Sequence, residues 1–267
     1  MAMGNAASTA SDALPLEIET RGAVLVVGLN RPAKRNALND GIILALRDCF
    51  SAISDEIGAV VIHGIGDHFS SGLDLSELTE RDATEGLVHS RMWHRVFDRI
   101  QYCRVPVIAA LKGAVIGGGL ELACAAHIRV AEPSAYFALP EGQRGIFVGG
   151  GGSVRLPRLI GVPRMTDMML TGRVYSATEG AAYGFSQYLT EADGALSKAL
   201  ELAERVAANA PLTNFAVLQA LPMIAEANPQ TGLLMESLMA TVAQSDKEAK
   251  KRIRAFLDRK TAKVKPT

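Results

Sequence analysis

The chain has 267 residues, 48% of them hydrophobic and 21% charged, which is typical of a folded soluble protein and excludes a disordered or fibrous one. Its 28 basic and 28 acidic residues cancel, so no overall basic charge indicates nucleic-acid binding. The three cysteines are odd in number and far apart, which argues against a disulfide framework and favours a reducing compartment.

The first residues of the chain carry no targeting signal that we recognise. The stretch MAMGNAASTASDALP is small and polar and lacks the basic and apolar regions of a signal peptide, so we expect a disordered tail over residues 1–14. No apolar run reaches the roughly 20 residues of a membrane-spanning helix. These features predict a cytoplasmic protein that has no membrane segment.

Strands and helices alternate from residue 15 onward. Residues 16–30 read as two strands around a turn at Arg21-Gly22, because they are rich in β-branched side chains. The segment GIILALRDCFSAI has helical periodicity, and either Asn39 or Asp40 can cap it. The sequence AVVIHG at 59–64 then has the composition of a short buried strand.

The same alternation continues through the middle of the chain. A helix is expected over 88–100, and the sequence PVIAAL at 106–111 reads as another buried strand. A glycine run and a helix of small residues follow, and the segments HIRVAE and AYFALPE read as further strands. Alternating strands and helices predict an α/β core with parallel pairing.

The last quarter of the chain has a different character. After residue 190 the pattern is helical, and we expect breaks at Pro211, Pro222 and Pro229. We therefore divide the chain into a core over 15–190 and a helical C-terminal region over 191–267. Such an apolar helical region commonly packs on a partner subunit, so we expect a homo-oligomer.

The stretch IGGGLELA at 116–123 carries a single carboxylate, Glu121, in an otherwise apolar segment. Taken alone, three glycines more often mark a tight strand-to-helix turn than a functional site. A dinucleotide-binding loop is excluded, because Leu122 and Val154 occupy the third glycine position of G-x-G-x-x-G in the two glycine runs. The start of a helix here would offer free N–H groups to an oxyanion, with Glu121 on the same face.

A second carboxylate, Glu141, lies in the stretch YFALPEGQRGIFVGGGG, twenty residues further along the chain. By itself it reads as an ordinary loop glutamate. Two glutamates beside glycine-rich turns favour an acid–base pair, whose environments would decide which one holds the proton. Spacing along the chain does not establish that the two side chains meet.

Five motifs in order resemble the enoyl-CoA hydratase/isomerase, or crotonase, superfamily over about residues 16–260. They are NRPAKRNALN (30–39), FSSGLDL (69–75), PVIAALKGAVIGGGLELACAAHIRVA (106–131), FALPEGQRGIFVGGGGSVRLPRLIG (137–161) and LTGRVYSATEGAAYGFS (170–186). The resemblance implies the α/β spiral of ββα units that this superfamily shares with the Clp proteolytic subunit, followed by C-terminal helices that mediate oligomerisation.

The resemblance also implies an active site. The family binds acyl-CoA thioesters and holds the thioester oxygen between two backbone N–H groups, which by motif position are those of Leu73 and Gly118. Glu121 matches the glutamate that activates water, and Glu141 matches the one that exchanges a proton at the α-carbon. Because isomerases of the family typically keep only one of the two glutamates, the presence of both favours hydration.

Contacts with coenzyme A follow from the same motifs. Lys34 and Arg35 suit the phosphates, although both also read as solvated surface charges, and the basic C-terminal segment adds Arg259 and Lys260. The remaining matched positions are Ala37, Ser71, Asp74 and Leu75. The resemblance implies no cofactor beyond the CoA of the substrate, and it implies a trimer or a dimer of trimers.

Two positions depart from the common pattern of the family. His127 stands where many members have aspartate, and Val148 where many hydratases have proline. Neither change removes a catalytic group, and His127 reads as a structural substitution. The remaining histidines have no metal-ligand spacing, so we expect no metal site.

Overall similarity favours one substrate, methylthioacryloyl-CoA of dimethylsulfoniopropionate degradation, whose hydration and thioester hydrolysis would yield methanethiol, acetaldehyde, CO2 and CoA. A general short-chain enoyl-CoA hydratase of β-oxidation and an enoyl-CoA isomerase are the alternatives. Trp93, Phe97 and Phe137 could line the acyl pocket or simply fill the core. No serine sits with a histidine partner as a peptidase requires, and both glutamates argue against a non-catalytic or RNA-binding subunit.

Overall fold

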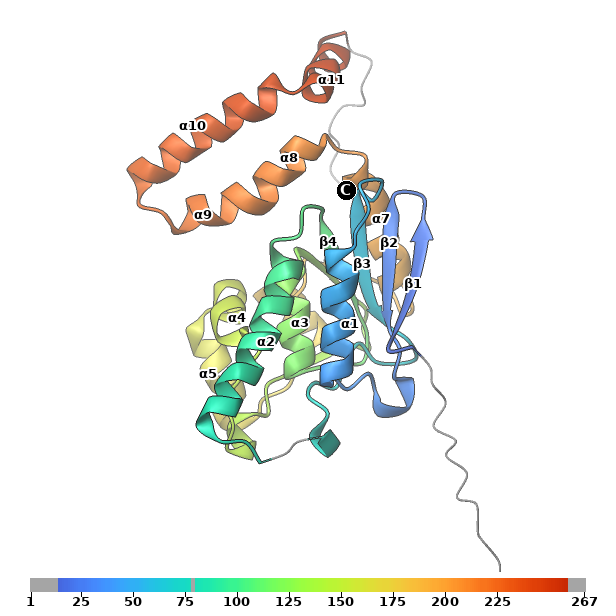
Figure 1. Cartoon of the computed structure of the whole chain (residues 1–267), viewed down its shortest axis with the longest axis vertical. Coiled ribbons are helices and arrows are strands. Elements are labelled where there is room, and N and C mark those ends of the chain that lie inside the picture. The colour runs from blue at the N-terminus through green and yellow to red at the C-terminus, as the bar shows by residue number, and fades with distance from the viewer. Residues whose placement is uncertain (1–13, 78–79, 259–267) are drawn as a thin grey trace, which may run out of the picture.

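The computed structural model describes residues 14–77 and 80–258. The predicted tail over residues 1–14 therefore lies outside the described residues, apart from Leu14, and so do Arg259 and Lys260. The described chain forms two sheets, three helices against one face of the larger sheet, one helix against its other face, and a projecting group of C-terminal helices (Figure 1).

The larger sheet has six strands in the order β1-β2-β3-β4-β6-β9, namely Leu16–Arg21, Val24–Leu29, Ala59–Gly64, Val107–Leu111, Ile128–Ala131 and Tyr188–Leu189. The edge strand β1 is antiparallel to β2, as the expected turn at Arg21-Gly22 requires. Every other pairing is parallel, with Val26 opposite Val61 and Val61 opposite Ile108. Parallel pairing in the predicted α/β core is therefore confirmed.

The smaller sheet determines where the two glutamates lie. Its strands are β5 (Ala114–Ile116), β7 (Tyr136–Ala138) and β8 (Tyr175–Ser176), in that order. Strands β5 and β7 are parallel, and Ile116 is opposite Ala138. Because both strands end at the same edge, the segments that carry Glu121 and Glu141 leave the sheet side by side, although twenty residues separate them in the chain.

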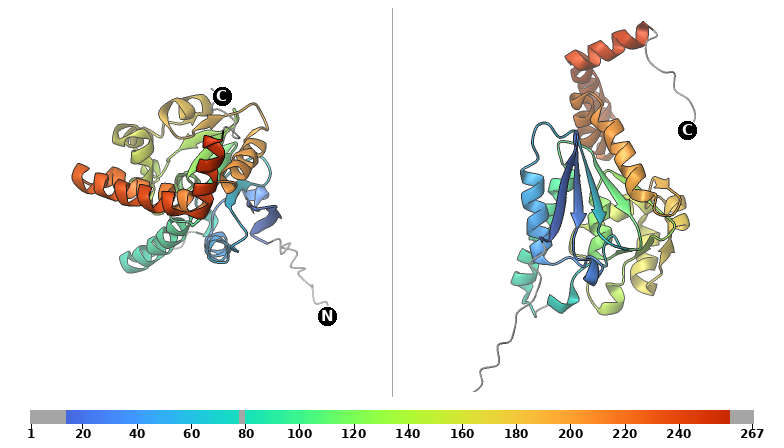
Figure 2. Two further views of the ribbon diagram at one scale, coloured as in Figure 1. Left: turned by 90° about the horizontal axis from the view of Figure 1, so that it is seen from above. Right: turned by 90° about the vertical axis from the view of Figure 1, so that its right-hand side faces the viewer.

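Helices cover both faces of the larger sheet (Figure 2). One face packs with α1 (Asp40–Ser51), α2 (Ala83–Gln101) and α3 (Gly118–Ala125) in the main hydrophobic core. The other face packs against α7 (Ala195–Ala207) through small and branched residues of both elements. Of the two expected caps of α1, Asn39 is the one used, because its side chain accepts a hydrogen bond from the Ile42 N–H.

The remaining helices are short and surround this core. The α-helices α4, α5 and α6 span Gly152–Ile160, Val162–Thr171 and Ala177–Tyr183. The 3-10 helices η1, η2 and η3 span Pro32–Lys34, Leu75–Glu77 and Gly142–Arg144. Helix α4 follows the second glycine run, so its N-terminus faces α3.

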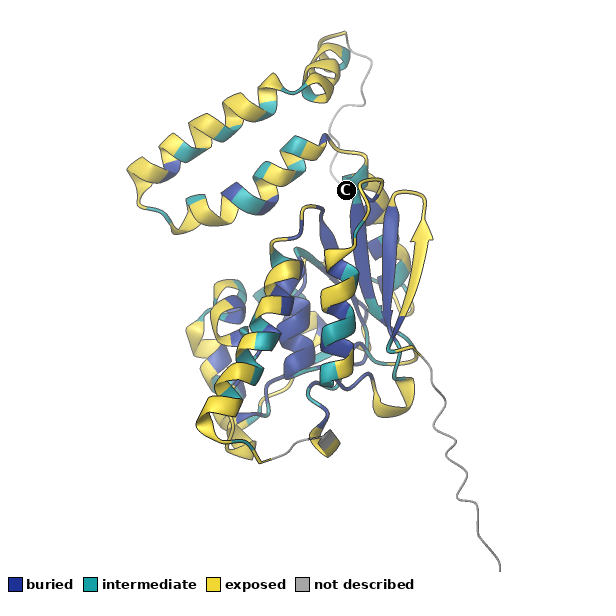
Figure 3. Cartoon of the chain, viewed as in Figure 1, coloured by how far each residue is buried: buried dark blue, intermediate teal, exposed yellow. Residues whose placement is uncertain are grey.

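Four α-helices and one π-helical turn project beyond the sheet and expose most of their surface (Figure 3). They are α8 (Pro211–Phe215), which runs through a π-helical turn η4 (Ala216–Ala220) into α9 (Leu221–Glu226), then α10 (Pro229–Ser245) and α11 (Lys247–Leu257). Their exposed side chains include Met223, Leu233 and Leu238. Because α7 packs on the sheet and only the later helices project, the predicted division at residue 190 stays a prediction.

The predicted break at Pro222 is wrong. Pro211 and Pro229 begin helices, as expected, but the helical run over 211–226 continues through Pro222. Proline has no N–H to donate to the preceding turn and crowds it. The π-helical turn immediately before α9 widens the backbone at that point and accommodates the proline ring.

Candidate active site

The glycine run places the start of α3 against two other parts of the site. Gly117 has a φ of +53°, which a side chain rarely adopts, and a Cβ there would lie 2.6 Å from Oε1 of Glu141. A Cβ at Gly118 would lie 2.9 Å from the ring of Trp93 and 3.6 Å from the Leu73 backbone nitrogen. Glycine is therefore required here by close approach as well as by backbone conformation.

The backbone N–H groups of Leu73 and Gly118 lie close together and remain available to a ligand. The Leu38 N–H donates to the Gly72 carbonyl at 2.7 Å, and the Asp74 N–H donates to the Leu38 carbonyl at 2.8 Å, so these bonds fix the loop on both sides of Leu73. Among residues 14–77 and 80–258, neither the Leu73 nor the Gly118 N–H has a hydrogen-bond acceptor. This pair has the geometry expected of an oxyanion hole.

Glu121 is the one charged side chain of α3, a helix whose residues are all buried. Its Oε1 accepts hydrogen bonds from the N–H groups of Gly150 at 2.9 Å and Gly152 at 2.7 Å. Gly152 is the first residue of α4, so the carboxylate also lies at the positive end of that helix. The Gly149 N–H is a further donor to the carboxylate, and Glu121 lines the cavity described below, where a ligand or water can reach it.

The environment of Glu121 acts on its pKa in two directions. Burial raises the pKa, and the Gly152 and Gly150 N–H groups together with the charge of Arg155 partly offset that increase. The carboxylate thus has fixed donors that stabilise its ionised form within an apolar helix. Such a group is suited to accept a proton from a bound water.

Glu141 follows β7 and Pro140 and is 8% exposed. Burial, and next the negative charge of Glu121, raise its pKa to about 7. Its Oε2 is buried and has no hydrogen-bond partner among the described residues. A carboxyl group with this pKa is about half protonated at neutral pH and can donate a proton.

One cavity of about 440 Å³ brings these groups together. Glu121, Glu141, Leu73 and Gly118 all line it, and so does Trp93, one of the three aromatic residues considered for an acyl pocket. Phe97 instead packs edge-on against Trp93, and Phe137 stacks on Phe185 in the core. The remaining wall is largely apolar and includes Ile116, Ile146, Phe147 and Val148.

A second groove of about 440 Å³ adjoins the first cavity and collects six of the predicted CoA contacts, which are Lys34, Arg35, Ala37, Ser71, Asp74 and Leu75. Ser71, Leu73, Leu75 and Arg144 line both spaces, so the two meet at the Leu73 backbone. An extended ligand can therefore pass from the basic groove to the two glutamates beside the paired N–H groups.

The side chain of Asp74 is committed to the protein. It is 5% exposed and pairs with Arg31 at 2.9 Å and Lys34 at 3.0 Å. Burial alone would raise the pKa of Asp74, but hydrogen bonds from Ser76, Lys34 and Arg31 hold it well below its usual range. Asp74 therefore shapes the groove, and its pairing with Lys34 occupies one of the two predicted phosphate contacts.

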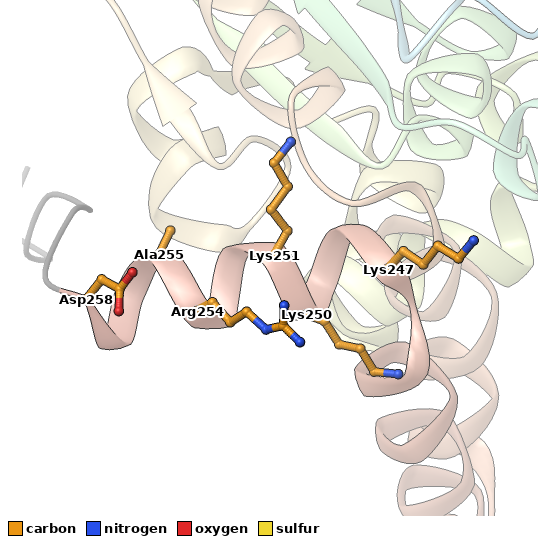
Figure 4. A pocket seen from close by; sticks show the side chains of 6 residues that line it. All are labelled: Lys247, Lys250, Lys251, Arg254, Ala255 and Asp258. Carbon is orange, nitrogen blue, oxygen red and sulfur yellow. The ribbon is translucent and has the colours of Figure 1, made fainter.

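The basic C-terminal helix lies apart from the cavity of the glutamates. Side chains of Lys247, Lys250, Lys251 and Arg254 line a shallow depression along α11 (Figure 4). No described residue of α11 lines either the cavity or the adjoining groove. The predicted contacts of Arg259 and Lys260 with CoA lie outside the described residues.

His127 has a structural position. Its Nδ1 accepts a hydrogen bond from the Val107 N–H at 2.9 Å, and its Nε2 lies 2.9 Å from the Gln101 carbonyl, which requires the tautomer protonated at Nε2. Burial lowers the pKa of His127 to about 4, so the ring is neutral at physiological pH. Across the part of the chain that the structure describes, no cluster of potential metal ligands occurs, and no helix is long and apolar enough to cross a membrane.

Three residues of the site were not predicted from the sequence. Arg144 lines both spaces, Ser90 donates to the Gly149 carbonyl at 2.7 Å, and Arg155 donates to the Gly150 carbonyl at 2.9 Å. Arg144 and Arg155 flank the second glycine run, which is the one signal that could have indicated them. Ser90 lies on α2, where no sequence motif marks it.

Comparison with known proteins identifies relatives over nearly the whole chain. The family model for enoyl-CoA hydratase/isomerase matches residues 19–266. The 2,3-dehydroadipyl-CoA hydratase of Escherichia coli K12 is 34% identical over 252 residues, which are 94% of this chain and 98% of that protein. The short-chain-enoyl-CoA hydratase of Clostridium acetobutylicum is 32% identical, over 91% of this chain and 94% of its own length.

A solved structure is closer still. The crystal structure of a protein from Rhodopseudomonas palustris CGA009, provisionally named as an enoyl-CoA hydratase, is 82% identical to this chain with a TM-score of 0.91. The match covers 94% of this chain and 97% of that one. The chain belongs to the enoyl-CoA hydratase/isomerase family, and the expected crotonase-like α/β fold with C-terminal helices is confirmed. Membership of the family implies an acyl-CoA substrate.

Proposed function

We propose that this protein is a hydro-lyase that adds water across the α,β-double bond of short-chain enoyl-CoA thioesters. The observation that carries the proposal is the convergence of two buried carboxyl groups and two available backbone N–H groups on one cavity. The relatives from Escherichia coli and Clostridium acetobutylicum are both named as hydratases of CoA thioesters, which supports the same reaction.

The geometry supports different roles for the two glutamates, one as general base and the other as general acid. The thioester oxygen would accept hydrogen bonds from the Leu73 and Gly118 N–H groups, which stabilise the enolate as it forms. The Glu121 carboxylate would take a proton from water as the water oxygen bonds to the β-carbon. The π electrons move onto the thioester oxygen and then return, and Glu141 delivers a proton to the α-carbon. Overall, one water adds across the double bond.

The protonation states suit these roles. Glu141, whose pKa burial raises to about 7, holds a proton for donation at neutral pH. Glu121 has two N–H donors and the N-terminus of α4, which support the anion required of a general base. After each addition Glu121 carries a proton and Glu141 lacks one, and a proton passed from the first to the second restores the starting state.

Substrate placement follows from the two adjoining spaces. CoA would occupy the basic groove beside Arg35, its thioester would reach the Leu73 N–H, and the acyl group would lie in the apolar cavity beside Trp93. The cavity of about 440 Å³ would also have to admit the reacting water, which favours a short acyl chain.

The particular acyl group remains a prediction. The sequence favours methylthioacryloyl-CoA, but the relatives described above are named for general or different enoyl-CoA substrates, so a general short-chain hydratase has the better support. An isomerase is less favoured, because both glutamates line the cavity.

The test is a direct comparison of substrates. Purified protein is incubated with crotonyl-CoA and separately with methylthioacryloyl-CoA, and the products are identified by mass spectrometry. Rapid formation of 3-hydroxybutyryl-CoA supports the general hydratase, and release of methanethiol with free CoA from the second substrate supports the narrower function. A shifted double bond without added water would indicate an isomerase, and no reaction with either would contradict the proposal.

The projecting helices support a homo-oligomer, as a trimer or a dimer of trimers. Exposed apolar side chains recur along α8 to α11, including Phe215, Leu221, Leu234, Leu238 and Phe256. A surface of this kind commonly forms a subunit interface. Light scattering coupled to size exclusion should give three or six times the mass of the 28.3 kDa chain, and a monomer would contradict this assignment.

A further inference from the structure

Arg155 is a buried cation beside the reacting groups, and the reaction outlined above gives it no role. It lies on α4, is 7% exposed, and faces the second glycine run. A Cβ at Gly151 would lie 2.2 Å from its Nη1, so the loop passes directly over the guanidinium group. Burying a charge is costly, and a protein retains one only where it is paired and hydrogen-bonded.

The guanidinium group joins its own helix, α4, to the glycine loop and to α2. Its Nη1 donates to the Gly150 carbonyl at 2.9 Å, its Nη2 to Oδ1 of Asp98 at 2.6 Å, and its Nε to Oε1 of Gln101 at 2.6 Å. Asp98 and Gln101 lie on one face of α2, one turn apart. The glycine loop over 149–152 is therefore tied to α2 by a rigid, planar group with fixed donor directions.

The same loop holds Glu121. The N–H of Gly150, the residue whose carbonyl Arg155 binds, donates to Oε1 of Glu121, and so does the N–H of Gly152. A chain of direct contacts thus runs from α2 through Arg155 and the loop to the carboxylate. Glycine residues offer the loop no side-chain packing that could fix it. Hydrogen bonds from Ser90 to the Gly149 carbonyl and from Arg155 to the Gly150 carbonyl fix it instead, and of these two side chains only Arg155 carries a charge.

We propose that Arg155 is a positioning residue for hydration: it fixes the glycine loop to α2 and thereby holds the Glu121 carboxylate where it can activate water. This inference rests on the proposed hydratase function and names a further residue of the same site. Arg155 acts through the loop and touches no reacting atom itself.

The charge of Arg155 also acts on Glu121. The charged and titratable groups that face Glu121 are Arg155 from α4, Glu141 after β7, and the Cys124 thiol of its own helix. Asp98 and His94 of α2 face Arg155. Of these groups, only Arg155 lowers the pKa of Glu121, so its loss should make Glu121 harder to ionise while leaving Glu141 nearly unaffected.

The test compares three variants, Arg155→Gln, Arg155→Lys and Arg158→Gln. Arg158 lies one turn further along α4, is 55% exposed at its side chain and pairs with the exposed Glu226, so it is the matched control. Folding is checked by circular dichroism and thermal unfolding, and kcat and KM for crotonyl-CoA are measured across pH.

We expect Arg155→Gln to lower kcat at least about tenfold with little change in KM, because small misplacements of a catalytic group are costly. The acid limb of the kcat profile, where Glu121 takes up its proton, should move to higher pH by about half a unit or more. Arg155→Lys should fall between the wild type and Arg155→Gln, and Arg158→Gln should behave as the wild type.

The inference is overturned if the acid limb stays in place and kcat falls only in proportion to the folded fraction, which is the behaviour of a merely structural residue. If Arg155→Gln does not fold, the limb measured in Arg155→Lys decides the question by the same criterion. Failure of the wild type to hydrate any enoyl-CoA would overturn the proposed function instead, so the two failures are distinguishable.

Discussion

Replacing Gly117 by alanine should lower kcat sharply while leaving the protein folded. The added Cβ would lie 2.6 Å from Oε1 of Glu141 and 3.6 Å from Cδ. Ordinary van der Waals contact begins at about 3.4 Å, so the carboxyl oxygen has to move by the difference, 3.4 minus 2.6, or about 0.8 Å. Because a misplacement of about 1 Å can cost about 10²-fold in rate, we expect kcat to fall by tens-fold to about 10²-fold.

The stability cost of Gly117→Ala comes mainly from the backbone. Gly117 has φ +53° and ψ −124°, a conformation that a residue with a side chain adopts at a cost of about 1–3 kcal/mol. The clash itself adds little, because the group that it meets is the end of a side chain that can turn aside. Thermal unfolding should therefore shift by several degrees, and the protein should remain folded.

Gly22→Ala is the matched control. Gly22 has φ +58° in the turn between β1 and β2, and a Cβ there would meet nothing within 4 Å. It should show a comparable loss of stability with unchanged kcat for crotonyl-CoA. If Gly117→Ala folds and keeps kcat within about twofold of the wild type, the placement of Glu141 beside Gly117 is not catalytically relevant and the reasoning fails.

Three further predictions follow from the charged and titratable groups. Glu121→Gln and Glu141→Gln should each lower kcat by about 10²–10⁴-fold, which is typical for loss of a general acid or base. A wild-type rate in either variant would show that the replaced residue is not catalytic. Burial raises the pKa of Glu141, and the charge of Arg144 partly offsets that increase. Arg144→Gln should therefore move the alkaline limb of the kcat profile, where Glu141 loses its proton, to higher pH. An unchanged alkaline limb would show that Arg144 does not act on Glu141. Because burial lowers the pKa of His127 from 6.5 to about 4, its neutral ring contributes stability that is fully present above pH 6.5 and is lost as pH falls toward 4, by about 3 kcal/mol. The free energy of unfolding of His127→Asn in urea should depend less on pH over that range than that of the wild type. An identical pH dependence in the two proteins would refute this role of His127.

Local patterns predicted the larger sheet well because its strands are short, apolar and buried. The segment AVVIHG corresponds to β3 at both ends, and the two strands around Arg21-Gly22 are β1 and β2. The break expected at Pro222 failed, because a preceding π-helical turn compensates for the proline and leaves no signal in composition. The sequence also did not indicate that α7 covers the sheet while later helices project from it.

The two glutamates were identified from sequence by family motifs, whereas their meeting depends on tertiary structure. The parallel register of β5 and β7 places Ile116 opposite Ala138, and this pairing of distant segments cannot be read from local periodicity. Arg155 was missed for the same reason. Its partners Asp98 and Gln101 are more than fifty residues away in the chain, so its burial and its contact with the glycine loop appear only in the folded molecule.

The most direct test of the central claim is the hydration of crotonyl-CoA in oxygen-18 water by the wild type and by Glu121→Gln, with the product analysed by mass spectrometry. The proposed function predicts that the wild type forms 3-hydroxybutyryl-CoA with one oxygen-18 atom in the β-hydroxyl group, and that Glu121→Gln forms it at least about 10²-fold more slowly. An absence of labelled product from the wild type, or equal rates in the two proteins, would contradict it.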